Sequence, residues 1–385
     1  MEFDSKPDMP VYLSNYPAHQ RGEISLLTTP ERTGALPQYT GQGVTIAFID
    51  SGFYRHPDLK GRILAHVDAT TSSIVESDYV PKSPAFSWHG QMTTVIACGD
   101  GSKSGGRYRG IASGASLLLI KVSNPRNEIK EADILRGLRW LLKHHQRYNV
   151  KIVNLSVGGD YVSYDAYHPL HRVVGDLTAA GVTVIAAAGN SAHDHLVPPA
   201  SAADAITVGG VDDHNTLDRA AWTLYNHNYG MAYDGSTKPD VLAPARWVAS
   251  PILPGTQVAM EAFWLGPLMQ SDESHPVRQL IRQGSAAKGL AKLFGDFQNS
   301  EHMQQRVYTH KLVDAYHQHV DGTSVAAPIV SAIAAQMLEA NPRLTPAQIR
   351  QCLRDTAHAL PNIAANLQGA GVINAAVAVQ TAISG

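Results

Sequence analysis

The stretch GVTIAFIDSG, residues 43–52, decides the fold class of this 385-residue chain. Its first part is a nearly continuous apolar run without period-2 alternation, which is typical of a strand buried on both faces of a parallel sheet. The same pattern recurs, so the predicted strands are 44–49, 116–122, 152–156, 182–187 and 205–208. The helices predicted between them are 91–98, 131–146 and 171–180, each long enough for a right-handed crossover. The sequence therefore predicts an α/β fold: a doubly wound, mostly parallel sheet with helices on both faces.

Two regions interrupt this alternation. Residues 1–40 are rich in Pro, Gly, Tyr and Thr with weak periodicity, and we expect an extended N-terminal strap. Residues 251–320 repeat apolar side chains at three-and-four spacing around 277–297, which predicts a helical insertion subdomain. The pair His317 and His319 in this region is a weak metal signal, and a solvated helical face is the favoured interpretation. Residues 41–250 and 321–385 then form one α/β domain that ends in helices at 324–340 and 345–357.

Composition excludes several classes of protein. Lys and Arg number 31 against 33 Asp and Glu, so the net charge of −2 gives no reason to expect a nucleic-acid partner. No stretch approaches the roughly 20 apolar residues of a membrane span. The acidic start, residues 1–6, lacks the basic and apolar segments of a secretory signal, so we expect a cytoplasmic protein unless the chain is a processed secreted form. Cys98 and Cys352 are expected to be buried free thiols.

Four polar residues stand where an α/β sheet places its ligands. Asp50 ends an apolar strand, His89 opens a helix, Asn190 follows a strand, and Ser324 begins a long apolar helix. Taken singly, each has an ordinary alternative explanation: a ligand-binding carboxylate, a structural histidine, a turn asparagine and a helix cap. Pro328 is expected to cost little, because the sequence places it in the first turn, where N–H groups have no intrahelical partner.

Taken together, Asp50, His89 and Ser324 supply the parts of a nucleophilic site. A serine hydroxyl needs a base, and the base needs a carboxylate that holds its tautomer and stabilises the imidazolium. The chain order Asp, His, Ser and the setting of each residue resemble the subtilisin-like serine peptidases, the subtilases. Further segments similar to that family are His56-Pro57-Asp58-Leu59, Gly110-Ile111-Ala112, Asn154-Leu155-Ser156-Val157-Gly158, Lys238-Pro239-Asp240-Val241-Leu242-Ala243-Pro244 and Gly369-Ala370-Gly371-Val372-Ile373-Asn374.

The resemblance implies a serine endopeptidase that hydrolyses protein or peptide substrates through an acyl-enzyme on Ser324. In that reading His89 moves the proton, Asp50 orients His89, and Asn190 with the backbone N–H of Ser324 holds the oxyanion. The substrate-binding residues that the resemblance implies are Ser156, Val157 and Gly158 for the substrate backbone, laid down as an added strand, and Ala188 and Gly189 for the side-chain pocket.

The chain also departs from the family. Asp58 matches a position that supplies a calcium ligand in many members, but the loop 99–109 is basic and glycine-rich, so we expect no cofactor and no metal. The insertion directly before the serine segment favours a selective processing protease. Alternatives are a catalytically weak scaffold of the same fold, or a transpeptidase with the same triad. A nucleotide-binding enzyme is disfavoured, because no GxxxxGK[ST] loop or GxGxxG follows a strand. The sequence gives no basis for predicting the oligomeric state.

Overall fold

The computed structural model describes residues 19–20, 23–24, 26–71, 73–77, 87–269 and 300–384. The chain divides into two compact units. One unit comprises Leu27–Val248 and Asp321–Gly385, and the other comprises Met1–Leu26 and Ala249–Val320. Every candidate site residue belongs to the first unit.

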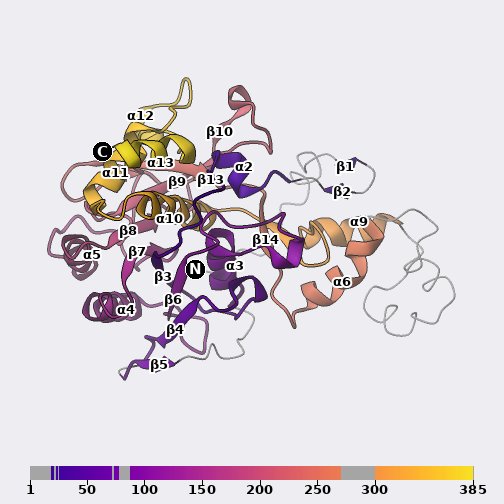
Figure 1. The fold of residues 1–385 in the computed structure, drawn as a ribbon, viewed down its shortest axis with the longest axis horizontal. Coiled ribbons are helices and arrows are strands. Elements are labelled where there is room, and N and C mark those ends of the chain that lie inside the picture. Colours follow the sequence, from indigo (N-terminus) through magenta and orange to yellow (C-terminus); the bar gives the residue numbers. More distant parts are fainter. Residues whose placement is uncertain are drawn as a thin grey trace. The chain divides into compact units, whose positions relative to one another are not determined.

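The first unit is built on a nine-stranded sheet (Figure 1). Its strands in spatial order are β10 (Thr223–Leu224), β9 (Ile206–Asp212), β8 (Thr183–Ala187), β7 (Val150–Leu155), β3 (Thr45–Asp50), β6 (Ser116–Lys121), β4 (Ile63–Asp68) and β5 (Val75–Ser77), and β13 (Val241–Pro244) also pairs with β9. Neighbouring strands are parallel except at β4–β5 and β9–β10. The predicted doubly wound, mostly parallel sheet is therefore confirmed. The five predicted strands correspond to β3, β6, β7, β8 and β9.

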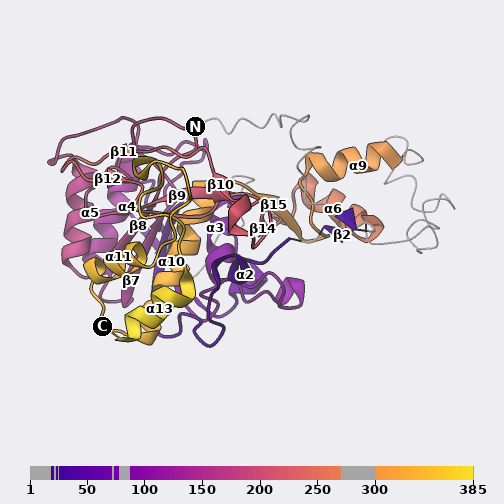
Figure 2. The same ribbon diagram turned by 90° about the horizontal axis from the view of Figure 1, so that it is seen from above.

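Helices cover both faces of this sheet (Figure 2). On one face, α3 (Trp88–Cys98) packs beside α10 (Thr323–Ala340), which also contacts β7, β8, β9 and β13. On the other face, α4 (Glu131–His144) packs beside α5 (Pro169–Ala179). The helix α11 (Pro346–Asp355) packs on α13 (Ala375–Ser384), which in turn packs on α10. The crossover helices of the prediction are thus present as α3, α4 and α5.

The apolar helix α10 is a core helix of the first unit. Among the described helices it is the one with the length and apolarity to cross a membrane by composition, but 83% of its residues are buried inside the fold. Cys98 and Cys352 are free and buried, as predicted, and burial raises the pKa of the Cys98 thiol to about 12.

The order of the strands locates the binding crevice. The chain passes from β3 to β4 and β6 on one side, and then crosses to β7 on the other side of β3. Ligands of open α/β sheets bind at the carboxyl ends of the strands, where the strand order reverses. This point lies between β3, which ends at Asp50, and β7, which ends at Leu155.

The segment predicted as an extended strap contains a helix. Thr28 forms a capping box with Glu31, in which each side chain accepts a hydrogen bond from the other residue's backbone N–H. Pro30 stands near the start of this helix, α2 (Thr29–Thr33), and Gly34 ends it in the left-handed region. These local signals override the weak apolar periodicity of the segment.

The second unit contains α6 (Gln257–Met269), α9 (Ser300–Thr309), and a two-stranded sheet of β14 (Val248–Pro251) and β15 (His317–Val320). The buried carboxylate of Glu261 on α6 accepts hydrogen bonds from Arg306 Nε at 2.9 Å and His310 Nε2 at 2.6 Å, which ties α6 to the region of α9. The apolar repeat at 277–297 lies outside the described residues. His317 contacts Asp314, and no described group of three or more His, Cys, Asp or Glu side chains is arranged to hold a metal ion.

Candidate active site

Asp50 and His89 form a buried pair. Asp50 is the last residue of β3 and His89 is the second residue of α3, and their side chains are 0% and 7% exposed. His89 Nδ1 lies 2.7 Å from Asp50 Oδ1. The same oxygen accepts a hydrogen bond from Ser51 N at 2.7 Å, and Asp50 Oδ2 accepts one from Thr93 Oγ1 at 3.0 Å. The carboxylate is thus held on both oxygens, and the pairing at Nδ1 assigns the role of proton acceptor to Nε2.

A close approach of α3 to the turn after β3 makes this pair possible. A Cβ atom on Gly90 would lie 2.0 Å from the carbonyl oxygen of Gly52 and 2.8 Å from Phe53 Cδ1. Only glycine fits at this position, because the nearest atom is backbone and cannot rotate away. The glycine that follows His89 in the sequence therefore allows the helix to approach the strand end.

Ser324 lies in the first turn of α10, after Gly322 with φ of 133°. Its Oγ lies 3.4 Å from the carbonyl oxygen of Ser156, and Ser156 Oγ donates to the carbonyl oxygen of Ser324 at 3.3 Å. Ser324 therefore contacts the residue that follows β7, at the switch point of the sheet.

The placement of Pro328 corrects the expectation from the sequence. The helix starts at Thr323, so Pro328 is its sixth residue and not part of its first turn. The missing N–H of Pro328 would have bonded to the carbonyl of Ser324, four residues earlier. The hydroxyl of Ser156 donates to that carbonyl instead. This contact from the residue that follows β7 reduces the cost of the proline.

Asn190 faces the start of α10. Its Oδ1 accepts hydrogen bonds from Thr323 N at 2.8 Å and Thr323 Oγ1 at 3.0 Å, and Thr323 Oγ1 accepts one from Gly189 N at 3.0 Å. Because the oxygen of the amide is occupied by two donors, its NH₂ group is the end left to donate to a substrate. The amide therefore stands beside the residue that precedes Ser324 and can stabilise a developing negative charge.

The remaining predicted residues line the same edge of the sheet. Ser156, Val157 and Gly158 follow β7, and Ala188 and Gly189 follow the neighbouring parallel strand β8. Ala188 and Ser156 are buried, while Val157, Gly158 and Gly189 are half-buried. The structure thus places all nine predicted site residues at the carboxyl ends of β3, β7 and β8 or on the two helices packed beside them.

Two positioning residues were not predicted from the sequence. Thr93 holds Asp50 Oδ2, and it stands one helical turn after His89, a spacing that could have identified it. Asn228 Oδ1 accepts hydrogen bonds from Ser191 N and His193 N at 2.9 and 3.2 Å, and so fixes the loop after Asn190. No local sequence pattern distinguishes Asn228 from an ordinary loop residue.

The side chains around Asp58 do not fit calcium. Asp58 Oδ1 accepts hydrogen bonds from Ser102 Oγ at 2.8 Å and from Lys103 N at 3.1 Å, while the buried Oδ2 has no hydrogen-bond partner. Calcium needs six to eight oxygen ligands, and here an O–H and an N–H group point at the carboxylate from the loop where further ligands would stand.

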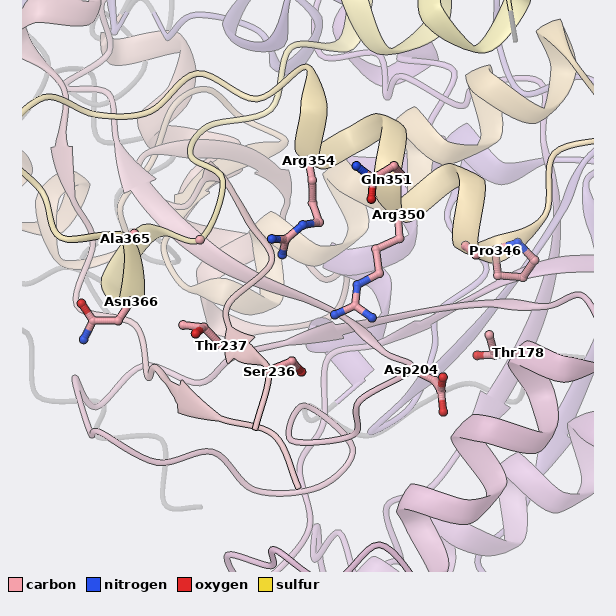
Figure 3. Close-up of a pocket in the computed structure, with 12 residues that line it drawn as sticks. Thr178, Asp204, Ser236, Thr237, Pro346, Arg350, Gln351, Arg354, Ala365 and Asn366 are labelled. Atoms are coloured by element: carbon pink, nitrogen blue, oxygen red, sulfur yellow. The ribbon is translucent and has the colours of Figure 1, made fainter. Parts of the chain in front are cut away.

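A cavity of about 530 Å³ lies elsewhere in the unit (Figure 3). It is lined by Arg350 and Arg354 of α11, by α12 (Ala365–Gln368), and by Asp204, which precedes the amino end of β9. Arg350 Nε and Arg354 Nη1 donate to Asp240 Oδ1 at 2.8 and 3.2 Å. None of the candidate catalytic residues lines this cavity, and its basic side chains form an ion cluster that joins α11 to the start of β13.

Comparisons of the sequence with known proteins find serine proteases among its relatives. AprX, a serine protease of Bacillus subtilis (strain 168), is 30% identical over 344 residues, which cover 87% of this chain and 66% of AprX. Subtilisin Savinase of Lederbergia lenta is 26% identical over 342 residues, which cover 89% of this chain and 92% of that relative. Subtilisin-like protease 3 of Pseudogymnoascus destructans is 29% identical, and the match covers 61% of it. This chain thus spans less than two thirds of the length of AprX and of subtilisin-like protease 3.

Solved structures share the fold of this chain. Fervidolysin from Fervidobacterium pennivorans, a keratinolytic enzyme related to subtilisin, has a TM-score of 0.63 at 21% identity, covering 95% of this chain and 47% of fervidolysin. A mutant of the protease domain of PatA has a TM-score of 0.60 at 20% identity, covering 91% of this chain and 98% of that domain. The family model of the subtilases matches residues 41–371, most of the chain. This chain belongs to the subtilase family.

Proposed function

We propose that this protein is a serine endopeptidase that cleaves peptide bonds through an acyl-enzyme on Ser324. The observation that carries the proposal is the buried contact of 2.7 Å between Asp50 Oδ1 and His89 Nδ1 at the carboxyl end of β3, where an α/β sheet binds its ligand. Membership of the subtilase family, and relatives named as proteases, support it.

The proposed mechanism assigns one role to each residue. Ser324 Oγ attacks the scissile carbonyl while His89 Nε2 takes its proton, and Asp50 stabilises the imidazolium through Nδ1. The tetrahedral intermediate places its negative oxygen between Asn190 Nδ2 and the N–H of Ser324, where the positive end of the α10 dipole adds to the stabilisation. His89 then gives the proton to the leaving amine. Water attacks the acyl-enzyme with His89 again as base, which releases the acid and restores Ser324.

The proposed substrate contacts follow the two strand ends. Residues 156–158 directly follow β7, so we assign them to the substrate backbone, which would pair with them as an added strand. Ala188 and Gly189 are small residues beside that segment, and we assign them to the pocket for the side chain that precedes the cleaved bond. Small walls suit a large apolar side chain at that position.

We also infer a restricted substrate range, as in a processing protease. The observation that favours it is the position in the chain of residues 249–320, a separate compact unit that ends directly before Asp321 and Ser324. Replacing residues 256–316 with a short linker and screening a peptide library tests this inference. A broader cleavage pattern is expected, and an unchanged pattern with retained activity would contradict it.

Labelling with a serine-directed phosphonate tests the catalytic proposal itself. Native protein should gain the mass of one adduct, located at Ser324 by peptide mapping, because the Asp50–His89 pair activates that hydroxyl. The Ser324→Ala variant and heat-denatured protein should gain none. An adduct that persists in Ser324→Ala, or no adduct on native protein, would contradict the assignment.

A further inference from the structure

Arg32 of α2 is a buried cation that the proposed mechanism does not use. Its side chain is 0% exposed, and all three guanidinium nitrogens donate hydrogen bonds. The acceptors are Leu27 O at 3.1 Å, Asp213 Oδ1 and Oδ2 at 3.0 and 3.2 Å, Arg246 O at 2.8 Å, Asn215 Oδ1 at 3.1 Å and Trp247 O at 2.9 Å. Asp213 balances the charge. The contacts with Asp213, Asn215, Arg246 and Trp247 connect α2 to two distant loops, while the contact with Leu27 is local.

One of these loops also holds the start of α10. Residues 245–247 follow β13, and Gly322 N donates to Ala245 O at 2.8 Å. Trp247 N donates to Asp321 Oδ1 at 2.8 Å. Asp321 and Gly322 directly precede the turn that carries Ser324. A series of hydrogen bonds therefore leads from Arg32, through the loop 245–247, to Asp321 and Gly322, which directly precede Thr323 and Ser324.

The backbone of Trp247 shows why this loop needs support from both sides. Its φ is 53°, in the left-handed region that a bulky side chain rarely adopts, and its side chain is buried. Such a conformation persists only where its surroundings over-determine it. Arg32 binds the carbonyl of Trp247 and Asp321 binds its N–H, so the two contacts fix both sides of the strained residue.

We propose that Arg32 is a positioning residue for the nucleophile: it holds the loop 245–247 and, through it, the N-terminal turn of α10. The inference rests on the proposed role of Ser324. It gives the segment around α2 a function in catalysis, because the order of that segment determines where the Ser324 hydroxyl stands. Lysine cannot replace Arg32, since one ammonium cannot reach Asp213 and the carbonyls of Arg246 and Trp247 in the planar fork of a guanidinium.

Arg32→Lys tests the proposal, with Arg350→Lys as the matched control. Arg350 also donates to a buried carboxylate and a carbonyl, Asp240 Oδ1 and Ala203 O, but it lies on α11, and the two residues that it binds precede β13 and β9. The readouts are the limiting rate of phosphonate labelling, kcat and KM on one peptide, and the melting temperature. Arg32→Lys should lower kcat and the labelling rate about 10- to 100-fold, with KM and the midpoint of the pH profile unchanged.

The control separates positioning from general loss of stability. Arg350→Lys should lower the melting temperature and leave kcat and the labelling rate at the wild-type level. A wild-type labelling rate in Arg32→Lys, or an equal fall in both variants, would overturn the inference. Native wild-type protein that does not label at all would overturn the proposed function instead, so the two failures are distinguishable.

A second variant covers the case in which Arg32→Lys does not fold. Asn215→Ala removes one acceptor of Arg32 and keeps the ion pair with Asp213, and it should give a smaller fall in kcat of the same kind. Combining it with Asp321→Ala, which removes the acceptor of Trp247 N, completes a double-mutant cycle. Effects on the labelling rate that are less than additive support a common path through Trp247, and additive effects would overturn it.

Discussion

Replacing Gly90 with alanine should damage catalysis through a clash of about 1 Å. The new Cβ would lie 2.0 Å from the carbonyl oxygen of Gly52, whereas such contacts are essentially never shorter than 3.0 Å. Either α3 or the turn after β3 must therefore move by at least about 1 Å. Gly90 directly follows His89, so the same movement lengthens the 2.7 Å contact between His89 Nδ1 and Asp50 Oδ1 beyond hydrogen-bonding range.

The size of the effect follows from this displacement. Overpacking of a rigid site costs about 1–3 kcal/mol of unfolding free energy, and a misplacement of 1 Å costs about 100-fold in rate. We therefore expect Gly90→Ala to lower kcat/KM about 100-fold, equivalent to about 2.7 kcal/mol of transition-state stabilisation. Phosphonate labelling of Ser324 should slow by a similar factor, because it needs the same base.

Gly175→Ala is the matched control for a glycine-to-alanine change inside a helix. Gly175 lies in α5 on the other face of the sheet, and the atom nearest to its added Cβ is Asp204 Oδ2 at 3.1 Å, the end of an exposed and flexible side chain. Kinetics on a peptide substrate and urea unfolding are measured for both variants. Gly175→Ala should keep wild-type kinetics and gain up to about 1 kcal/mol of stability. Wild-type kcat/KM in Gly90→Ala would refute the reasoning.

Three further predictions concern other parts of the unit. Asn190→Ala should lower kcat about 10²- to 10³-fold with little change in KM; steady-state kinetics check this, and a change confined to KM would contradict an oxyanion role. Burial lowers the pKa of His66 to about 4, so the unfolded chain binds a proton first as the pH falls from 6.5 to 4, and stability is lost across that window. Wild-type protein should lose about 2 kcal/mol more than His66→Gln between pH 7.5 and pH 5, and equal losses in urea unfolding would count against it. Added calcium should shift the melting temperature of wild type and Asp58→Asn equally, and a shift found in wild type alone would show that Asp58 binds it.

Much of the fold could be predicted because its strands are locally encoded. All six residues of β3 are buried, and the four residues between Thr45 and Asp50 are apolar. The strand β4 was not predicted, because it carries His66 and Asp68, and Leu64 is 40% exposed. Burial of His66 depends on packing against distant residues such as Phe53, and a local apolar pattern does not record such contacts.

In the candidate site, too, local sequence patterns identify some residues, while others depend on contacts with residues far away in the chain. Asp50 and Asn190 follow predicted strands and Ser324 begins a predicted helix, so a sequence pattern identifies all three. Asn228 and Arg32 act through hydrogen bonds to residues that are far away in the chain, and no spacing reveals such partners. The prediction for Pro328 was wrong because it depended on where the helix begins. In the first turn a proline takes no hydrogen bond from any helix carbonyl, but at the sixth residue of α10 it leaves the carbonyl of Ser324 without its helical N–H donor.

The buried carboxylates of Asp50 and Asp240 differ in their hydrogen-bond partners, and this difference indicates which of the two can take part in proton transfer. Asp240 is bound by Lys238 Nζ at 2.9 Å and by the guanidinium groups of Arg350 and Arg354, so three cations surround this carboxylate. Asp50 is bound by hydroxyl and backbone donors and by one imidazole. Imidazole is the side chain that gains and loses a proton in this pH range. The first arrangement fixes α11 to β13, while the second pairs a carboxylate with a group that can carry a proton. This difference in partners is the physical reason to propose a catalytic role for Asp50 and a structural one for Asp240.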